Sequence, residues 1–356
     1  MNKLLSVFAA SVATLAGCAS VGPKTVPIDR ADYGAAIADS WKAQTLLNIV
    51  KLRYMDLPVF MDVASVVAGY SLQTGVSVNA LVTNGDYRAG NLGSVGGQAI
   101  YTDRPTITYV PMTGEKFLRG LITPIDPKNI FFMLQAGYAA DFVLGLTVES
   151  LNGVRNSSTA RGVVREADPD FVQALKLMRD VQADGALGMR VEEDKARNAT
   201  GVVFFRRDDV SPEIAAKALE IRRLLKLPAE GEKYTLTYSP ARGAAHELTV
   251  NSRSMLQIMG AIASFVDVPE EHTKGNAVTP AFKNLSAEQL EQRARIHSGP
   301  DEPEHAFAAV KYRDYWFWVD ESDYQTKRVL VAVMFFFTLT DTGAETKLPL
   351  ITIPAQ

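Results

Sequence analysis

The stretch YSLQTGVSVNALV, from Tyr70 to Val82, alternates residue types with a period of two. One parity is mainly apolar and the other is mainly small and polar, with Leu81 as the exception. The apolar parity comprises Tyr70, Leu72, Thr74, Val76, Val78, Ala80 and Val82. Because successive side chains of a strand point to opposite faces, this pattern predicts a β-strand with one apolar face and one wet face.

A glycine-rich stretch, 84–97, follows this strand and opens with the turn signal Asn84-Gly85. A second alternating run then reaches Tyr109, and one of its parities contains Val95, Ala99, Tyr101, Ile107 and Tyr109. Two alternating runs on either side of turn-forming residues predict a long amphipathic β-hairpin over 70–109, with the glycine-rich stretch at its tip.

Shorter patterns on both sides of the hairpin predict helices that alternate with strands. Apolar spacing or a capping Ser, Thr or Pro predicts helices over 33–54, 113–122, 128–136, 168–183, 211–225 and 252–265. Strands are expected over 187–191 and 202–206, a second hairpin over 233–238 and 246–250, and either state over 141–151. The sequence therefore predicts an α+β fold of mixed or antiparallel sheets with packed helices.

The last third of the chain contains a polar segment between apolar ones. Residues 270–304 are rich in charge, and a surface excursion with a short helix near 286–295 is expected there. Val329 to Leu339 is almost entirely apolar, which favours a C-terminal strand buried on both faces. The alternative is a buried helix that begins at Ser322 or Asp323. A final strand is expected over 348–353.

The first residues of the chain predict an export signal. Lys3 supplies a positive charge, and Leu4 to Leu15 is an apolar run too short to cross a bilayer. Small residues then precede Cys18, which is the one cysteine of the chain. Residues 1–17 are therefore expected to be a signal peptide.

The four residues Leu15, Ala16, Gly17 and Cys18 match the lipobox at every position, so this N-terminus resembles that of bacterial lipoproteins. The resemblance implies cleavage before Cys18 and acylation of its thiol with palmitate-type chains, which hold the protein to membrane lipid. Ala19-Ser20 follow the cysteine where an Asp would favour the inner membrane. The resemblance therefore implies the periplasmic face of the outer membrane.

The remaining chain divides by composition. Residues 18–32 contain glycine and proline and few large apolar residues, which predicts an extended, lipidated tether. Beyond the tether we expect an N-terminal α+β part over 33–165 and a C-terminal α+β part over 166–356. One continuous domain over both parts is the alternative.

Composition and motifs exclude several classes of function. The chain has 356 residues, 47% of them hydrophobic, and a net charge of -3, which argues against a nucleic-acid partner. It contains no Gly-x-Ser-x-Gly, His-Glu-x-x-His, Walker or Cys-x-x-Cys motif, so no catalytic residue and no cofactor is expected. His272, His297 and His305 lie among carboxylates, but a solvated acidic loop is favoured over a metal site.

Three functions remain. The favoured one is a structural or interaction component of a cell-envelope assembly, with an envelope protein or further copies of itself as partner. A candidate interaction surface is formed by Trp316 and Trp318, which lie on one face of a strand expected over 315–319. The second is an oligomeric β-barrel pore or export lipoprotein. Its hairpin positions would be Tyr70, Leu72, Val76, Val78 and Tyr101. The third is a glycan-acting periplasmic enzyme without a recognisable motif.

Overall fold

The computed structural model describes residues 22–67, 69–81, 92–158, 165–193, 199–206, 210–231, 233–274, 278–279 and 294–340. Within these ranges the chain forms two compact units. Unit 1 comprises residues 22–40 and 61–111, and unit 2 comprises residues 41–60 and 112–340. Helices and mixed and antiparallel sheets confirm the α+β fold. The domain boundary predicted at residue 165 falls inside unit 2.

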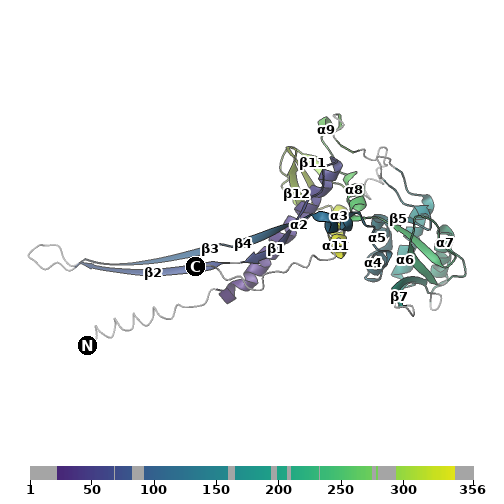
Figure 1. Ribbon diagram of the computed structural model, residues 1–356, viewed down its shortest axis with the longest axis horizontal. Coiled ribbons are helices and arrows are strands. Elements are labelled where there is room, and N and C mark those ends of the chain that lie inside the picture. Colours follow the sequence, from purple (N-terminus) through teal and green to yellow (C-terminus); the bar gives the residue numbers. More distant parts are fainter. Residues whose placement is uncertain are drawn as a thin grey trace, which may run out of the picture. The chain divides into compact units, whose positions relative to one another are not determined.

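Unit 1 contains two pairs of strands, which we call the ribbon (Figure 1). β2 (Tyr70–Leu81) and β3 (Leu92–Asp103) are antiparallel, in unbroken register from the pair Tyr70–Asp103 to the pair Leu81–Leu92. β1 (Phe60–Val67) pairs with β4 (Thr106–Met112). Between the two pairs, the Arg104 N–H donates to the Gly69 carbonyl at 2.9 Å. The predicted hairpin is thus confirmed over β2 and β3.

The glycines of the ribbon differ from the prediction. Gly93, Gly96 and Gly97 were expected at the tip, but they lie within β3. They pair with Ala80, Ser77 and Val76, and the register between the two strands is unbroken at these positions. The alternation of apolar and polar residues therefore fixes the register, and the glycines do not interrupt the strand. The Asn84-Gly85 turn lies outside the described residues.

α2 (Gly22–Arg53) corrects the prediction of an extended tether. The helix was expected to begin at Tyr33, but residues 22–32 already belong to it. Pro23 lies in the first turn, where its missing N–H leaves no hydrogen bond unmade. Pro27 lies inside the helix and removes one hydrogen bond. The prediction gave these prolines too much weight against the helix-forming residues that follow them.

Unit 2 contains a six-stranded sheet in the order β6-β5-β10-β9-β8-β7. Its strands are β5 (Val148–Leu151), β6 (Val154–Arg155), β7 (Leu187–Glu193), β8 (Ala199–Phe205), β9 (Lys233–Tyr238) and β10 (Glu247–Ser252). All neighbours are antiparallel except β9 and β10, which are parallel. The hairpin predicted for β9 and β10 is therefore wrong, because residues 239–246 lead the chain back to the start of β9.

Most predicted helices of unit 2 are confirmed. They are α3 (Gly114–Ile122), α4 (Pro127–Gln135), α5 (Ala140–Thr147), α6 (Pro169–Ala183), α7 (Pro212–Leu224) and α8 (Met255–Ala263). Two of the predicted caps form side-chain hydrogen bonds. Ser211 accepts from the Ile214 N–H, and Ser254 forms a reciprocal capping box with Gln257. α4 and α6 pack against strands of the sheet, and α7 packs on α6.

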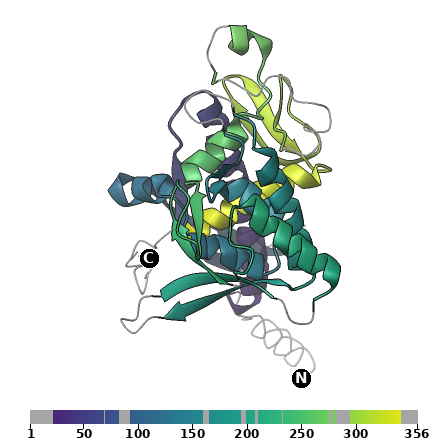
Figure 2. The ribbon, with the colours of Figure 1, turned by 90° about the vertical axis from the view of Figure 1, so that its right-hand side faces the viewer.

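The C-terminal part consists of a small sheet and a helix. β11 (His297–Gly299), β12 (Ala306–Tyr312) and β13 (Tyr315–Asp320) form an antiparallel sheet in the order β11-β13-β12. α11 (Tyr324–Thr340) occupies the stretch predicted as an apolar strand, so the helical alternative is confirmed. Asp323 caps it by accepting from the Thr326 N–H at 3.0 Å. Figure 2 shows α11 (yellow) between the other elements of unit 2, and Leu330, Val333 and Phe336 of this helix are buried.

Two further predictions concern the end of the chain. The strand over 348–353 lies outside the described residues, and so does most of the helix near 286–295. Within the polar segment the structure has α9 (Glu270–Lys274) and β11, neither of which was predicted.

The two units differ in burial. All the buried hydrophobic side chains of the described residues belong to unit 2, where all but Val202 form one continuous core. No side chain that the structure describes in residues 22–40 or 61–111 is buried. Among the described helices, none combines the length and the apolar character needed to cross a membrane.

Candidate functional site

The predicted lipidation site lies outside the described residues, so Leu15, Ala16, Gly17 and Cys18 keep their predicted roles as a proposal only. The predicted hairpin residues lie on the ribbon. Leu72 pairs with Tyr101, and Val78 pairs with Val95. Within β2 and β3 the apolar positions that the sequence distinguishes therefore lie on one face, as the alternation predicts.

Apart from Phe60 at the start of β1, the described side chains of the ribbon are exposed or half-buried. Six large apolar residues are exposed, namely Met61, Val67, Ile100, Ile107, Tyr109 and Val110. Among the described residues, no third strand joins either pair, so each pair has two outer edges without a strand partner. A two-stranded ribbon is only marginally stable by itself, and open edges favour pairing with another chain. The ribbon therefore has the properties of an assembly element.

The candidate surface on β13 is less open than expected. Phe317 and Val319 are fully buried and Trp316 and Trp318 are half-buried, so the predicted alternation is confirmed. β11 pairs with β13, and the ring of His297 stacks on Trp318 with 5.5 Å between ring centroids. The strand over 297–299 was missed because it lies in a segment too polar to predict a strand.

A cluster of rings surrounds Tyr54 in unit 2. A hydrogen bond of 2.8 Å joins its hydroxyl to Nδ1 of His272, and the guanidinium of Arg313 lies 4.8 Å from the centre of its ring. The Tyr315 hydroxyl donates to Glu271 at 2.6 Å. His272 is thus engaged with tyrosine rings, and no group of three or more metal-ligating side chains is found in the described part of the chain.

Burial raises the pKa of Tyr54 to about 12, although the positive charges of Arg313 and Arg53 oppose the shift. An unfolded chain loses this proton near pH 10. The contribution of the Tyr54 phenol to the free energy of unfolding is therefore fully present below pH 10, and it is lost as the pH rises from 10 to 12. We expect Tyr54→Phe to remove a step near pH 12 from the tyrosinate absorbance titration. Loss of a step near pH 10 instead would contradict the assignment.

Unit 2 also contains a cavity of about 680 Å³, with walls from α5, α6, α8 and α11. Much of its lining is apolar, including Phe142, Phe171, Leu175 and Ile262. Asp141 is the one carboxylate among the lining residues that the structure describes, and it pairs with Arg179 at 2.9 Å. Glycoside hydrolysis uses two carboxyl groups, and the described lining supplies this one.

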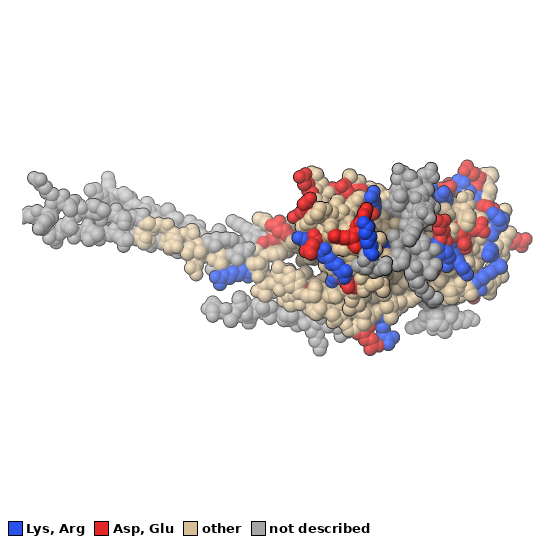
Figure 3. All heavy atoms as spheres, turned by 90° about the horizontal axis from the view of Figure 1, so that it is seen from above, with Lys and Arg blue, Asp and Glu red and all other residues tan. Residues whose placement is uncertain are grey.

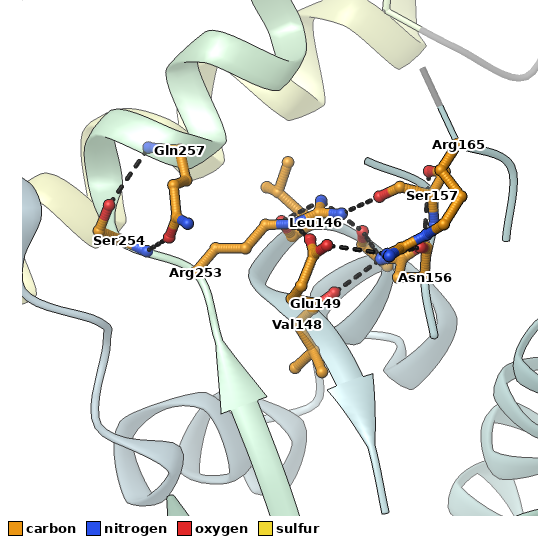
Figure 4. A network of polar contacts seen from close by, with 10 residues as sticks. Leu146, Val148, Glu149, Asn156, Ser157, Arg165, Arg253, Ser254 and Gln257 are labelled. Carbon is orange, nitrogen blue, oxygen red and sulfur yellow. Dashed lines mark hydrogen bonds and ion pairs between the residues drawn. The ribbon is translucent and has the colours of Figure 1, made fainter. Parts of the chain in front are cut away.

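Arg253, Asn156 and Ser157 of the cavity lining belong to a partly buried polar network around Glu149 (Figure 4). Glu149 binds Nε of Arg253 at 3.1 Å and Nη2 of Arg165 at 2.9 Å. Arg253 also donates to the carbonyls of Leu146 and Ser157, so all its nitrogens have acceptors. Burial lowers the pKa of Arg253, and Glu149 opposes that shift.

Charge on the surface agrees with the composition. On the face of unit 2 that Figure 3 shows, basic and acidic side chains of the described residues are interspersed. Nucleic-acid binding requires a concentration of basic side chains. This face offers no support for such a partner.

Sequence reasoning found the ribbon but not the cavity or the Tyr54 cluster. Their residues come from distant parts of the chain, such as Phe142, Arg253 and Arg328 in the cavity. No local pattern marks them. Comparison of the chain with protein-family models, with curated proteins and with solved structures finds no match in any of the three.

Proposed function

We propose that this protein is a lipid-anchored structural component of the bacterial cell envelope that joins an assembly through its ribbon. The acylated Cys18 would hold it at the periplasmic face of the outer membrane, as the lipobox implies. The observation that carries the proposal is the ribbon of β1–β4, which has exposed apolar side chains and which no third strand of the described residues joins.

The ribbon has the features of a surface that another chain covers. Isolated strand pairs are marginal, and exposed apolar patches on soluble proteins mark interaction surfaces. No side chain that the structure describes in unit 1 is buried, and the exposed apolar ones are available to a partner. Strand addition or docking of another chain supplies both the missing hydrogen bonds and the missing apolar contact.

A second candidate is a pore to which several copies each donate their hairpin. Two observations favour it. β2 and β3 have 12 residues each, more than the about 9–11 that cross an outer membrane as a tilted strand. In addition, their register pairs Leu72 with Tyr101 and Val78 with Val95, whereas the opposite parity contains polar pairs such as Ser71–Thr102 and Asn79–Ser94, which suit a water-filled interior.

The proposal is tested by photo-crosslinking in cells. A photoreactive amino acid is placed at Ile100 or Tyr109 of the ribbon and, as a control, at Leu219, which is 50% exposed on α7. We expect discrete crosslinked products from the two ribbon positions and none from Leu219. We also expect these products to disappear with Cys18→Ser, because the chain then lacks its anchor. Equal products from Leu219, or ribbon positions without products, would contradict the proposal.

A further inference from the structure

We propose that the cavity of unit 2 is a binding site for a small apolar molecule with one anionic head group, a carboxylate being the simplest case. The proposal is independent of the ribbon, because every lining residue belongs to unit 2. The volume of about 680 Å³ lies in the range of small-molecule sites, which are mostly apolar with a few polar groups that orient the ligand.

The apolar part of the site comes from three helices. Phe171 and Leu175 of α6, Ile262 of α8 and Phe142 of α5 are buried or half-buried and line the cavity. Gly145 of α5 also lines it, and a Cβ atom there would meet only Leu175, at 3.8 Å. A hydrocarbon tail or a ring displaces water from such a surface, which favours binding.

The charged part of the site is Arg328 of α11. Its guanidinium lies 3.8 Å from the centre of the Phe142 ring, and it lines the cavity. Its Nε atom is buried and has no hydrogen-bond partner, and no carboxylate pairs with this residue among those the structure describes. A buried donor without an acceptor is costly. An anionic head group in the cavity would give the guanidinium the charged partner that it lacks among the described residues.

The other basic side chains of the lining differ in whether a carboxylate of the described residues already pairs with them, which decides whether they are available to an anionic ligand. Arg253 is fully engaged by Glu149 and backbone carbonyls, and Arg179 is paired with Asp141. Lys176 is exposed on α6, and the described residues provide no carboxylate for it. Arg328 is thus the main contact for an anion, and Lys176 is a second cation of the lining. A cationic ligand would meet an unfavourable field here.

The test is isothermal titration of the full chain in a nonionic detergent, with the heat of injection into the same micelles subtracted. The probe is octanoate, which has an apolar tail and a carboxylate. Octylammonium has the same tail with the opposite charge, and acetate has the head group without the tail. We expect saturable 1:1 binding of octanoate and none of the other two.

Two substitutions test the role of Arg328. We expect Arg328→Gln to weaken octanoate binding roughly ten- to a hundredfold, the usual effect of losing a hydrogen bond to a charged group, and Arg328→Lys to restore part of it. Arg119→Gln is the matched control, because Arg119 is 73% exposed on α3 and pairs with Glu115 outside the cavity. It should leave the affinity unchanged. Thermal unfolding of each variant shows whether it is folded.

Four results would overturn the inference. They are the absence of saturable octanoate binding, equal affinity of a folded Arg328→Gln variant, equal affinity for octylammonium, and equal affinity for acetate. The first three exclude an anion site at Arg328. The last excludes the apolar part of the site. None of them bears on the crosslinks from the ribbon.

Discussion

Glu149→Ala is expected to lower the free energy of unfolding of unit 2 by about 3–5 kcal/mol, which is the usual cost of leaving a buried charge without its partner. Arg253, whose side chain is only 7% exposed, loses its one carboxylate, and Arg165 loses the same partner. The backbone carbonyls that remain around Arg253 carry no net charge. The guanidinium is then buried with its charge uncompensated.

Denaturant unfolding followed by tryptophan fluorescence measures this effect, because all three tryptophans of the chain (Trp41, Trp316 and Trp318) belong to unit 2. The matched control is Glu115→Ala. Glu115 also pairs with an arginine, Arg119, but its side chain is 78% exposed, and exposed pairs contribute about 0–1 kcal/mol. A cost for Glu149→Ala as small as that for Glu115→Ala would show that the network does not stabilise unit 2.

Val76→Asp is expected to abolish the assembled form of the protein, whereas Ser77→Asp is expected to preserve it. The two positions are neighbours on β2 but have opposite parity, and they pair with Gly97 and Gly96. Val76 belongs to the apolar parity of the sequence, and burial of an unpaired carboxylate there against another chain or lipid costs more than the ~2–7 kcal/mol of a buried neutral polar group. Both variants add one carboxylate, and they differ only in the face of the ribbon on which that carboxylate lies.

Light scattering on a sizing column gives the particle mass of the full-length chain extracted in mild detergent. We expect a mass above that of one chain for the unmodified protein and for Ser77→Asp, and a reduced mass for Val76→Asp. Release of a dye trapped in lipid vesicles then distinguishes the two candidate functions, because only a pore makes vesicles leak. If all three proteins have the same mass, the apolar parity of β2 does not mediate assembly.

Local signals in the sequence were sufficient for much of the fold. Ser211 and Ser254 each begin a helix because their side chains bind the first free backbone N–H groups, an effect that depends on a few neighbouring residues. The alternation over Tyr70–Val82 predicted β2 for a similar reason, since strand parity is a property of adjacent residues. Elements with such signals were predicted nearly to their ends.

The errors concern structure that distant residues decide. An apolar run such as Val329–Leu339 suits a buried strand and a buried helix equally, and here the Asp323 cap and the surrounding core select the helix. The parallel pairing of β9 and β10 depends on how residues 239–246 return. Similarly, the cavity exists only after α5 and α11 have packed, so no stretch of sequence indicates Arg328 as a ligand-binding residue.

The strand order of the large sheet also determines when unit 2 can form during synthesis. β5 pairs with β10, and the Glu149–Arg253 ion pair joins residues 104 positions apart. At about 5–20 residues per second, the ribosome needs several seconds to make that interval. During this time β5 lacks its neighbour, and the core also awaits α11. A nascent chain of this protein therefore cannot complete the core of unit 2 until α11 has been made.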